Sequence, residues 1–239
     1  MDIRKFTLGL DLGQAADYSA LIGIERVIDQ DPRTYHLRII QRYPLRTPYT
    51  DIVKGMIAFV QTPELSGRCT LVIDATGVGA PVVDMFKAAN LACPFYAVNI
   101  TGGNVVTREG FRFNVPKRDL ATAVKVLLDD QRLRIAQALP QRELLLKELD
   151  NFKVKITPKG NDTYEAWREG EHDDLVLATA LACWLAEKSS KKMFAGIQPK
   201  VQDQPKDGVE VIEMPPPPSA EEMAKRFHKA PTWRELLRR

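Results

Sequence analysis

The residues of this chain best suited to chemistry are acids placed at the ends of apolar segments. Asp11 interrupts an apolar run near the start of the chain, Asp74 ends a second run, and Asp173 and Asp174 precede a third. A charge in an apolar segment is costly unless it is paired, hydrogen-bonded or bound to a metal. Each acid alone is equally well explained as a helix N-cap or a strand-end turn. Together they favour convergence on one metal site.

The donor atoms indicate which metal such a site would take. Carboxylate oxygens are hard ligands, which suit Mg²⁺ or Mn²⁺. The cysteines Cys69, Cys93 and Cys183 are far apart in the sequence and odd in number. This pattern predicts neither a zinc site nor a disulfide framework, and it is typical of a reducing compartment. We interpret the three cysteines as small buried hydrophobic residues.

The bulk composition allows one large domain with a tail, or two small domains. Of the 239 residues 44% are hydrophobic, which supports a substantial core, and the net charge of +3 permits nucleic-acid binding without arguing for it. No apolar run approaches about 18 residues, so we expect no membrane span. The first residues also lack the apolar segment of a signal peptide.

The patterning of the first third of the chain predicts how Asp11 and Asp74 are positioned. Apolar runs separated by polar turns predict an antiparallel meander of three strands, then a helix and a fourth strand. The expected strands are 6–13, 18–27, 35–43 and 70–74, and the helix begins near Thr50 and ends before Pro63. A strand reached by a helical crossover lies parallel to its partner, with both carboxyl ends at one edge. If the strands at 6–13 and 70–74 are neighbours, we expect the two acids to meet at that edge, where ligands usually bind such sheets.

The rest of the chain predicts alternating helices and strands that end in a buried helix. Gly77 and Gly79 indicate either a phosphate-binding turn or, the interpretation we favour, a tight strand-to-helix turn. We expect strands at 94–100, 133–135 and 152–156, the last with a hairpin partner at 163–167, and helices after residue 81 and at 116–130, 141–150 and 175–187. Residues 1–188 would form one domain, followed at 189–239 by a Pro-rich linker and a basic tail that is flexible or docks a partner.

In this order and spacing, the motifs resemble those of ribonuclease-H-like proteins. The closest resemblance is to the nuclease domain of the large terminase subunit of tailed phages, and it covers about residues 5–188. The segments that carry it are 8–13 (LGLDLG), 18–20 (YSA), 72–77 (VIDATG), 115–118 (VPKR), 148–152 (ELDNF) and 172–178 (HDDLVLA). The resemblance implies an α/β fold with a central mixed sheet, an antiparallel meander followed by parallel strands, flanked by helices.

The resemblance also implies roles for the acids. Asp11, Asp74 and Asp174 take the metal-binding positions, and Asp173 is a fourth acid beside them. His172 is a weaker candidate, better explained as a solvated loop histidine. The implied enzyme is an endonuclease that cuts double-stranded DNA with little sequence preference, using two Mg²⁺ or Mn²⁺ ions about 3.5–4 Å apart. In this hypothesis Asp11 bridges both ions, Asp74 and Asp174 each complete one shell, and Asp173 binds an ion or orients its water.

Partners of DNA packaging are implied in the same way. They are the terminase ATPase domain, the small terminase subunit and the portal protein, in the cytoplasm of an infected or lysogenic bacterial host. Large terminases also carry an ATPase motor, and the GxxxxGK(S/T) loop of such a motor does not occur in this sequence. We therefore expect an excised nuclease domain or a stand-alone relative, without motor activity.

Basic residues are predicted to contact the DNA backbone. Lys117 and Arg118 lie at an expected helix start, and Lys153, Lys155 and Lys159 lie on the expected hairpin. Strand alternation would place Lys153 and Lys155 on one face, although an ordinary solvated face explains them equally well. Because phosphate contacts carry no sequence information, such binding should be unspecific and strongly salt-dependent.

Three other functions stay open at this point. A Holliday-junction resolvase would use the same acids on branched DNA, as a dimer. A sugar-kinase-like or actin-like ATPase domain also begins with a Gly-x-Asp-x-Gly phosphate hairpin, as residues 9–13 do, but it needs a second glycine-rich hairpin, for which 74–79 is the only candidate. An assembly module docking on a portal would not need its acids, and all three positions are acidic here.

Overall fold

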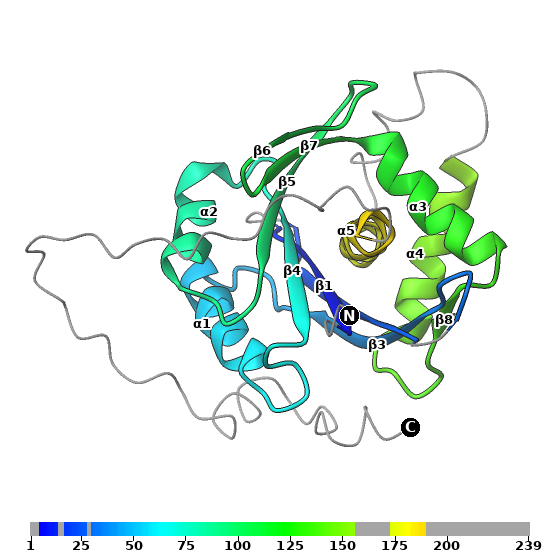
Figure 1. Cartoon of the computed structure of the whole chain (residues 1–239), viewed down its shortest axis with the longest axis horizontal. Helices are drawn as coiled ribbons and strands as arrows, with labels where there is room; N and C mark the ends of the chain where they lie inside the picture. The colour runs from blue at the N-terminus through cyan, green and yellow to red at the C-terminus, as the bar shows by residue number, and fades with distance from the viewer. Residues whose placement is uncertain (1–4, 14–16, 28–29, 156–172, 190–239) are drawn as a thin grey trace, which may run out of the picture.

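The fold is built on one mixed sheet. The computed structural model describes residues 5–13, 17–27, 30–155 and 173–189, without the side chains of residues 153–155. Its 8-stranded sheet has the order β6-β7-β5-β4-β1-β2-β3-β8 (Figure 1). The strands are β1 (Phe6–Asp11), β2 (Ala20–Arg26), β3 (Tyr35–Arg42), β4 (Cys69–Asp74), β5 (Phe95–Thr101), β6 (Thr107–Glu109), β7 (Arg112–Pro116) and β8 (Leu133–Ile135). The helices are α1 (Tyr49–Val60), α2 (Gly79–Ala88), α3 (Lys117–Asp129), α4 (Arg142–Lys155) and α5 (Asp174–Lys188).

The two halves of the sheet differ in strand direction, as predicted. β1, β2 and β3 form an antiparallel meander. β4 pairs in parallel with β1, and β5 and β7 continue the parallel half. The short strand β8 closes the other edge, in parallel with β3. The predicted α/β class with a mixed sheet is therefore confirmed.

Helices cover both faces of the sheet. α1 and α2 pack on one face, and α5, seen nearly end-on in Figure 1, packs on the other with α3 and α4 beside it. Alternation along β1 sends Phe6, Leu8 and Leu10 into the core under α1 and α2. Gly9 and Asp11, which alternate with them along the strand, therefore face α5.

α5 lies unusually close to β1. A Cβ atom added at Gly9 would lie 2.1 Å from the carbonyl oxygen of Ala178, so only glycine permits this approach. Every residue from 174 to 186 is buried, which confirms the expectation of a helix buried on all sides. The helix is thereby fixed against the strand that carries Asp11.

The carboxyl end of α5 is anchored by a polar cluster. Glu187 accepts a hydrogen bond from the Tyr35 hydroxyl at 2.8 Å and from both terminal nitrogens of Arg132 at 3.1 and 3.2 Å. The paired, charge-assisted contact of Arg132 is the strong kind of side-chain hydrogen bond. It ties α5 to β3 and to the segment that enters β8.

The strand predicted at 152–156 is wrong for the described residues. Residues 152–155 are the last turn of α4, because Leu145, Leu149 and Phe152 are spaced four and three residues apart and are all buried against the core under α5. The alternation of apolar and basic residues from 152 onward is typical of a strand, but Phe152 also continues the helical stripe of Leu145 and Leu149. The predicted hairpin partner at 163–167 lies outside the described residues.

A second difference is the hairpin of β6 and β7, which we did not predict. It joins antiparallel through Thr107–Asn114 and Glu109–Arg112, and it extends the parallel half of the sheet before α3 begins. Apart from Ser189, the proposed linker and tail at 189–239 also lie outside the described residues. Within the described ranges, no helix combines the length and apolar composition that a membrane span needs.

Candidate active site

Asp11 and Asp74 lie side by side at the carboxyl edge of the sheet. β1 and β4 pair through Leu10 and Ile73, so the residue that follows in each strand is an acid. Leu10 and Ile73 point into the core under α1 and α2, which places both acids on the α5 face. Their exposed fractions are only 7% and 2%. Two neighbouring buried carboxylates repel each other, and a cation between them would relieve that repulsion.

The same cross-strand row continues to an arginine. Asp11 is opposite Ala20 on β2, and Ala20 is opposite Arg42 on β3. Directly opposite residues of antiparallel strands share a face, so all three side chains lie on the side of α5. Ala20 is small and buried, and Arg42 extends from the end of this row toward the helix.

Arg42 forms a buried ion pair with Asp174, the first residue of α5. Its terminal nitrogen donates to Asp174 Oδ2 at 2.7 Å, and the two side chains are 11% and 7% exposed. The guanidinium also stacks on the ring of Tyr18, 3.7 Å from the ring centre. Within the described residues, Arg42 Nε is buried without a hydrogen-bond partner. A cation from β3 thus holds the first carboxylate of α5.

Glu148 of α4 holds the first turn of α5. Its Oε2 accepts hydrogen bonds from the backbone N–H groups of Leu175 at 3.1 Å and Val176 at 3.3 Å. Burial raises the pKa of Glu148 to about 7, and the charge of Asp174 acts in the same direction, whereas the two N–H groups and Arg42 oppose it. Among the described residues, Glu148 Oε1 has no hydrogen-bond partner.

Asp173 takes the N-cap position of α5. Its side chain makes no capping hydrogen bond, because Glu148 supplies the acceptor for the first turn instead. The simple explanation of Asp173 as a helix cap therefore does not account for it.

The turn after β4 orients Asp74. Asp74 Oδ1 accepts a hydrogen bond from the N–H of Thr76 at 2.7 Å, and Thr76 Oγ1 accepts one from the N–H of Ile100 at 2.7 Å. Gly77 and Gly79 have φ angles of 85° and 76°, which glycine adopts without strain. This is the tight strand-to-helix turn that we favoured in the sequence.

The acids are close to one another but are not arranged as a ligand set. Among the described residues, no group of three or more His, Cys, Asp or Glu side chains is placed to hold a metal ion. Asp74 is turned toward Thr76, and Asp174 toward Arg42. Metal ligation by Asp11, Asp74, Asp173 and Asp174 stays a prediction.

The chemistry of the site still fits a hard divalent cation. Its donors are carboxylate oxygens from β1, β4 and α5, and a further buried carboxylate oxygen, Glu148 Oε1, lacks a hydrogen-bond partner among the described residues. Oxygen-only donor sets of this kind suit Mg²⁺ or Mn²⁺. Rotation of the Asp74 and Asp174 side chains away from their present partners would free their oxygens to act as ligands.

The predicted DNA-contacting residues fall into two groups. Lys117 and Arg118 begin α3 directly after β7, so they lie at the same edge as Asp74, two strands away. Arg118 is exposed and donates to the carbonyl of Asn104 at 2.9 Å.

Of the other three basic residues, two lie in a helix where a hairpin strand was expected, and DNA contact by all three stays a prediction. Lys153 and Lys155 belong to α4, where successive residues turn by about 100°, so strand alternation no longer places them on one face. Lys159 and His172 lie outside the described residues.

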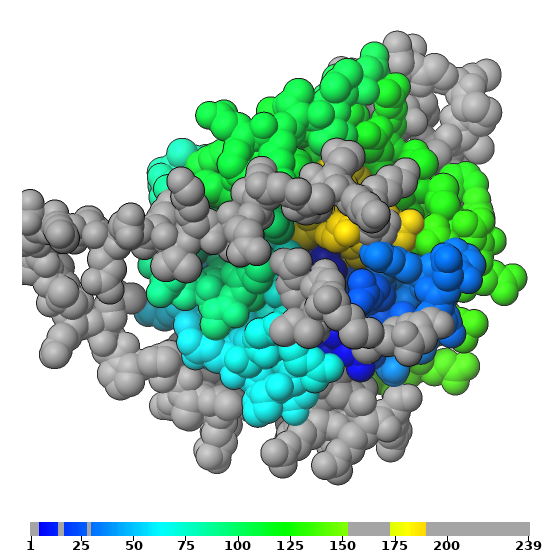
Figure 2. Space-filling model, viewed as in Figure 1, coloured from blue at the N-terminus to red at the C-terminus, as the bar shows by residue number. Residues whose placement is uncertain are grey.

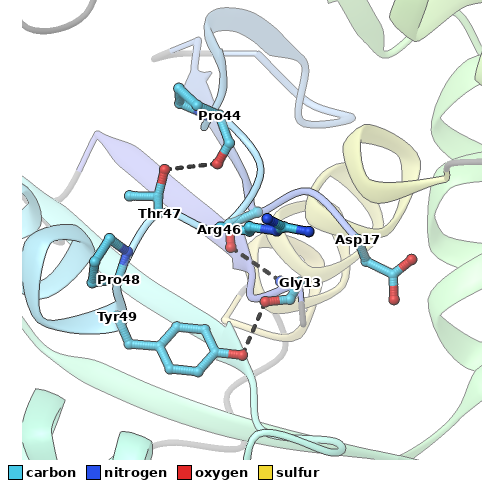
Figure 3. Close-up of a pocket in the computed structure, with 8 residues that line it drawn as sticks. Gly13, Asp17, Pro44, Arg46, Thr47, Pro48 and Tyr49 are labelled. Atoms are coloured by element: carbon cyan, nitrogen blue, oxygen red, sulfur yellow. Dashed lines mark hydrogen bonds between the residues drawn. The ribbon is translucent and has the colours of Figure 1, made fainter. Parts of the chain in front are cut away.

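A surface pocket of about 230 Å³ is lined by Gly13, which follows β1, and by Tyr49 at the start of α1. It lies between the end of β1 and the start of α1, and the Tyr49 hydroxyl donates to the carbonyl of Gly13 at 2.9 Å across it (Figure 3). Burial, and to a lesser degree the charge of Asp11, raise the pKa of Tyr49. In the space-filling view of Figure 2, some atoms of α5 (yellow) are visible between the green and blue segments of the chain.

No role was predicted for Arg42 or Glu148, although Glu148 opens the segment 148–152 that helps to carry the resemblance. Glu148 lies beside an apolar stripe of α4, and an acid in that place is a weak signal of a buried role. Arg42 has no local signal, because its importance depends on the register that places it opposite Ala20.

Comparison with solved structures identifies the fold. The large terminase nuclease from thermophilic phage G20c superposes with a TM-score of 0.50 at 19% identity, covering 74% of this chain and 80% of that one. The fold is ribonuclease-H-like, as found in a large terminase nuclease. At this identity the likeness establishes the fold alone, and the predicted resemblance is confirmed at that level.

Two further solved structures are more distant. The human cytomegalovirus terminase nuclease domain gives a TM-score of 0.46 at 15% identity, covering 77% of this chain and 85% of that chain. Thermus thermophilus RuvC gives 0.36 at 13% identity, covering 77% and 94%. No protein-family model matches the chain, and no curated protein matches it significantly.

Proposed function

We propose that this chain is a divalent-metal-dependent endonuclease that cuts double-stranded DNA. The observation that carries the proposal is the placement of Asp11 and Asp74 side by side on the α5 face, at the sheet edge where α5 presents Asp174. Three buried carboxylates from separate elements at one edge cost stability in a metal-free protein. A role in binding cations would explain why they are there.

In this proposal Asp11, Asp74 and Asp174 would hold the divalent metal, with Asp173 beside them at the N-cap of α5. A pair of divalent ions, when bound, supplies a nucleophile at neutral pH and neutralises charge on the leaving oxygen. The chain contributes the rest. The close packing of α5 on Gly9 and the contact from Glu148 fix the spacing between helix and strand, and so position Asp174 relative to Asp11.

Basic residues at the same edge would bind the DNA backbone. Lys117 and Arg118 lie two strands from Asp74, a separation of about 10 Å at ordinary strand spacing. This arrangement lets α3 hold the phosphates that flank the one at the acids. Such contacts position DNA without reading its sequence, so cleavage should show little sequence preference.

The biological setting in the proposal is phage DNA packaging, which the sequence resemblance to large terminases implies; the large terminase nuclease of phage G20c shares the fold. The partners would then be a terminase ATPase domain, a small terminase subunit and a portal protein, in the cytoplasm of a bacterial host. A resolvase acting on Holliday junctions is the second candidate, because it would use the same placement of acids. A nucleotide-binding domain is less well supported, since a tight turn and a helix follow Asp74 in place of a second phosphate hairpin.

Plasmid cleavage tests the proposal directly. We would incubate the purified chain with supercoiled and linear plasmid in Mg²⁺, Mn²⁺ or chelator, beside Asp74→Asn and the control Asp84→Asn. Asp84 lies on α2 and its side chain is 66% exposed, so its loss should change nothing. We expect metal-dependent cleavage of both substrates that disappears only in Asp74→Asn.

Other outcomes would redirect the proposal. Cleavage that survives Asp74→Asn would remove this acid from the site. A strong preference for a four-way junction over a linear duplex of the same sequence would favour the resolvase. Calorimetric binding of ATP without any cleavage would favour the nucleotide-binding alternative.

A further inference from the structure

We propose that Arg42 is a built-in counter-cation that takes the place of a divalent ion at Asp174, so that metal loading exchanges one cation for the other. This inference rests on the proposed function, since it concerns the same acids. In this inference Arg42 is a positioning residue. It acts on metal affinity through Asp174 and does not touch the reacting atoms.

The position of Arg42 is the first reason. It occupies the same cross-strand row as Asp11, and only the methyl group of Ala20 stands between them on that face. From there the guanidinium reaches Asp174 Oδ2 at 2.7 Å. A positive charge is therefore already held by one of the predicted metal ligands, on the side of the sheet where the other two acids point.

Charge balance is the second reason. Asp174 and Glu148 are both buried, and the charge of Asp174 raises the pKa of Glu148. Arg42 favours the charged form of Glu148 and pairs directly with Asp174. One arginine thus compensates the carboxylates at the start of α5, which is the electrostatic task that a divalent ion would perform.

The incomplete hydrogen bonding of Arg42 is the third reason. Arginine has five N–H donors in a rigid fork, and its best carboxylate contacts are bidentate. Arg42 donates to Asp174 through a terminal nitrogen, and among the described residues its Nε is buried without a hydrogen-bond partner. By contrast, Arg132 binds Glu187 through both terminal nitrogens. A structural ion pair would be expected to resemble the second arrangement.

Tyr18 gives the guanidinium a second attachment. The ring centre lies 3.7 Å from the Arg42 guanidinium carbon. The ring can therefore keep the guanidinium nearby after the Asp174 carboxylate has turned from Arg42 to a metal ion. A displaced Arg42 would then remain at the site, next to the phosphate of a bound DNA.

Metal affinity in Arg42→Met tests the inference. Methionine keeps an unbranched apolar stem without the charge. We would measure the dissociation constant for Mn²⁺ by titration calorimetry in the wild type, in Arg42→Met and in the control Arg38→Met. Arg38 lies on the same strand but pairs with Glu25, away from the acids. We expect the Arg42→Met constant to fall about tenfold and the Arg38→Met constant to match the wild type.

A second measurement does not depend on a variant that folds less well. The Nε–Hε signal of Arg42 in a nitrogen–proton NMR spectrum of the wild type, assigned with Arg42→Lys, should move saturably as Mg²⁺ is added. A third measurement uses the variant Asp174→Asn. In this background, replacing Arg42 with Met should leave the dissociation constant for Mn²⁺ unchanged, because there is no longer a carboxylate at position 174 for the two cations to share.

The outcomes separate this inference from the proposed function. Unchanged or weaker Mn²⁺ binding in Arg42→Met, or an Arg42 signal that ignores Mg²⁺ while the protein binds it, would overturn the exchange and leave the nuclease proposal standing. Binding only after Arg42 is replaced would support the exchange strongly. No binding in any variant would remove the metal site itself, and the inference with it.

Discussion

Glu148 accepts a hydrogen bond from the backbone N–H of Leu175 at 3.1 Å, and in this way α4 holds the first turn of α5. The same oxygen accepts a second bond from Val176. The position of Asp174, the residue before Leu175, is therefore set by an acid on a different helix. Changes to this packing, or to the acids that it places, should alter stability and metal binding in measurable ways.

Replacing Glu148 should loosen the amino end of α5. Glu148→Ala leaves two buried N–H groups without their acceptor, and we expect a loss of about 1–3 kcal/mol in the free energy of unfolding. Hydrogen exchange at Leu175 and Val176 should become faster. Glu143→Ala is the matched control, because Glu143 lies on the same helix with its side chain 85% exposed. Equal effects of the two substitutions would contradict a specific role for Glu148.

The stability of the metal-free protein should fall between about pH 4.5 and 7 because of Glu148. Its pKa rises from 4.5 to about 7 on folding, mainly by burial, so in this window the folded state binds more protons than the unfolded state. Stability from this group is thus greatest below pH 4.5 and is lost as pH approaches 7. Arg42 and Asp174 face the same group and do not reverse the direction. Urea unfolding in chelator should show the decline, and it should be smaller in Glu148→Gln.

A methyl group at position 9 should push α5 away from β1. In Gly9→Ala the new Cβ would lie 2.1 Å from the carbonyl oxygen of Ala178, a backbone atom that cannot move aside easily. We expect a loss of about 1–3 kcal/mol, the usual cost of overpacking, together with weaker metal binding. Gly102→Ala is the control, because nothing lies within 4 Å of a Cβ at that position. Wild-type stability of Gly9→Ala would show that α5 is packed less closely than described.

Removing one of the two neighbouring acids should stabilise the metal-free protein while abolishing its response to metal. In Asp11→Asn the repulsion from Asp74 disappears, an effect of at least about 1 kcal/mol, which is the value for unit charges about 4 Å apart in water, because buried charges are screened less. Thermal unfolding should therefore begin at a higher temperature in chelator, and Mn²⁺ should no longer raise it. A metal-induced increase equal to that of the wild type would mean that Asp11 does not bind metal.

The two basic residues at the start of α3 should contribute to the affinity for DNA and contribute little to any preference for DNA sequence. We expect the double substitution Lys117→Ala and Arg118→Ala to weaken duplex binding uniformly across sequences. It should also reduce the slope of log affinity against log salt by about 1 for each phosphate that the protein no longer neutralises. Lys125→Ala is the control on the same helix, since Lys125 pairs with Asp129 in the last turns of α3. Identical salt slopes for all variants would exclude this surface from the DNA path.

Much of the fold could be predicted, because strands and helices leave a periodic pattern of apolar residues in the local sequence. The meander, the crossover to β4 and the apolar α5 all carry strong periods of two or of three to four residues, and each lies where it was predicted. The failure at 152–155 has the same origin. Phe152 fits both a strand alternation and the helical stripe of Leu145 and Leu149, and only its packing under α5 decides for the helix.

The sequence by itself determined which acids would gather at one edge. A parallel crossover puts the carboxyl ends of β1 and β4 at one edge whatever their side chains are, so Asp11 and Asp74 were expected together on the condition that the two strands are neighbours, which the structure shows.

Only the tertiary structure decided what these acids contact. Arg42 meets Asp174 because a cross-strand register and a helix crossing coincide, and Glu148 reaches α5 because α4 packs beside it. Such contacts join elements that are far apart in the chain, and their geometry depends on packing to within a few tenths of an ångström. No local period encodes that, so the partners of the acids, and with them the proposed exchange of Arg42 for a metal ion, were visible only in the folded chain.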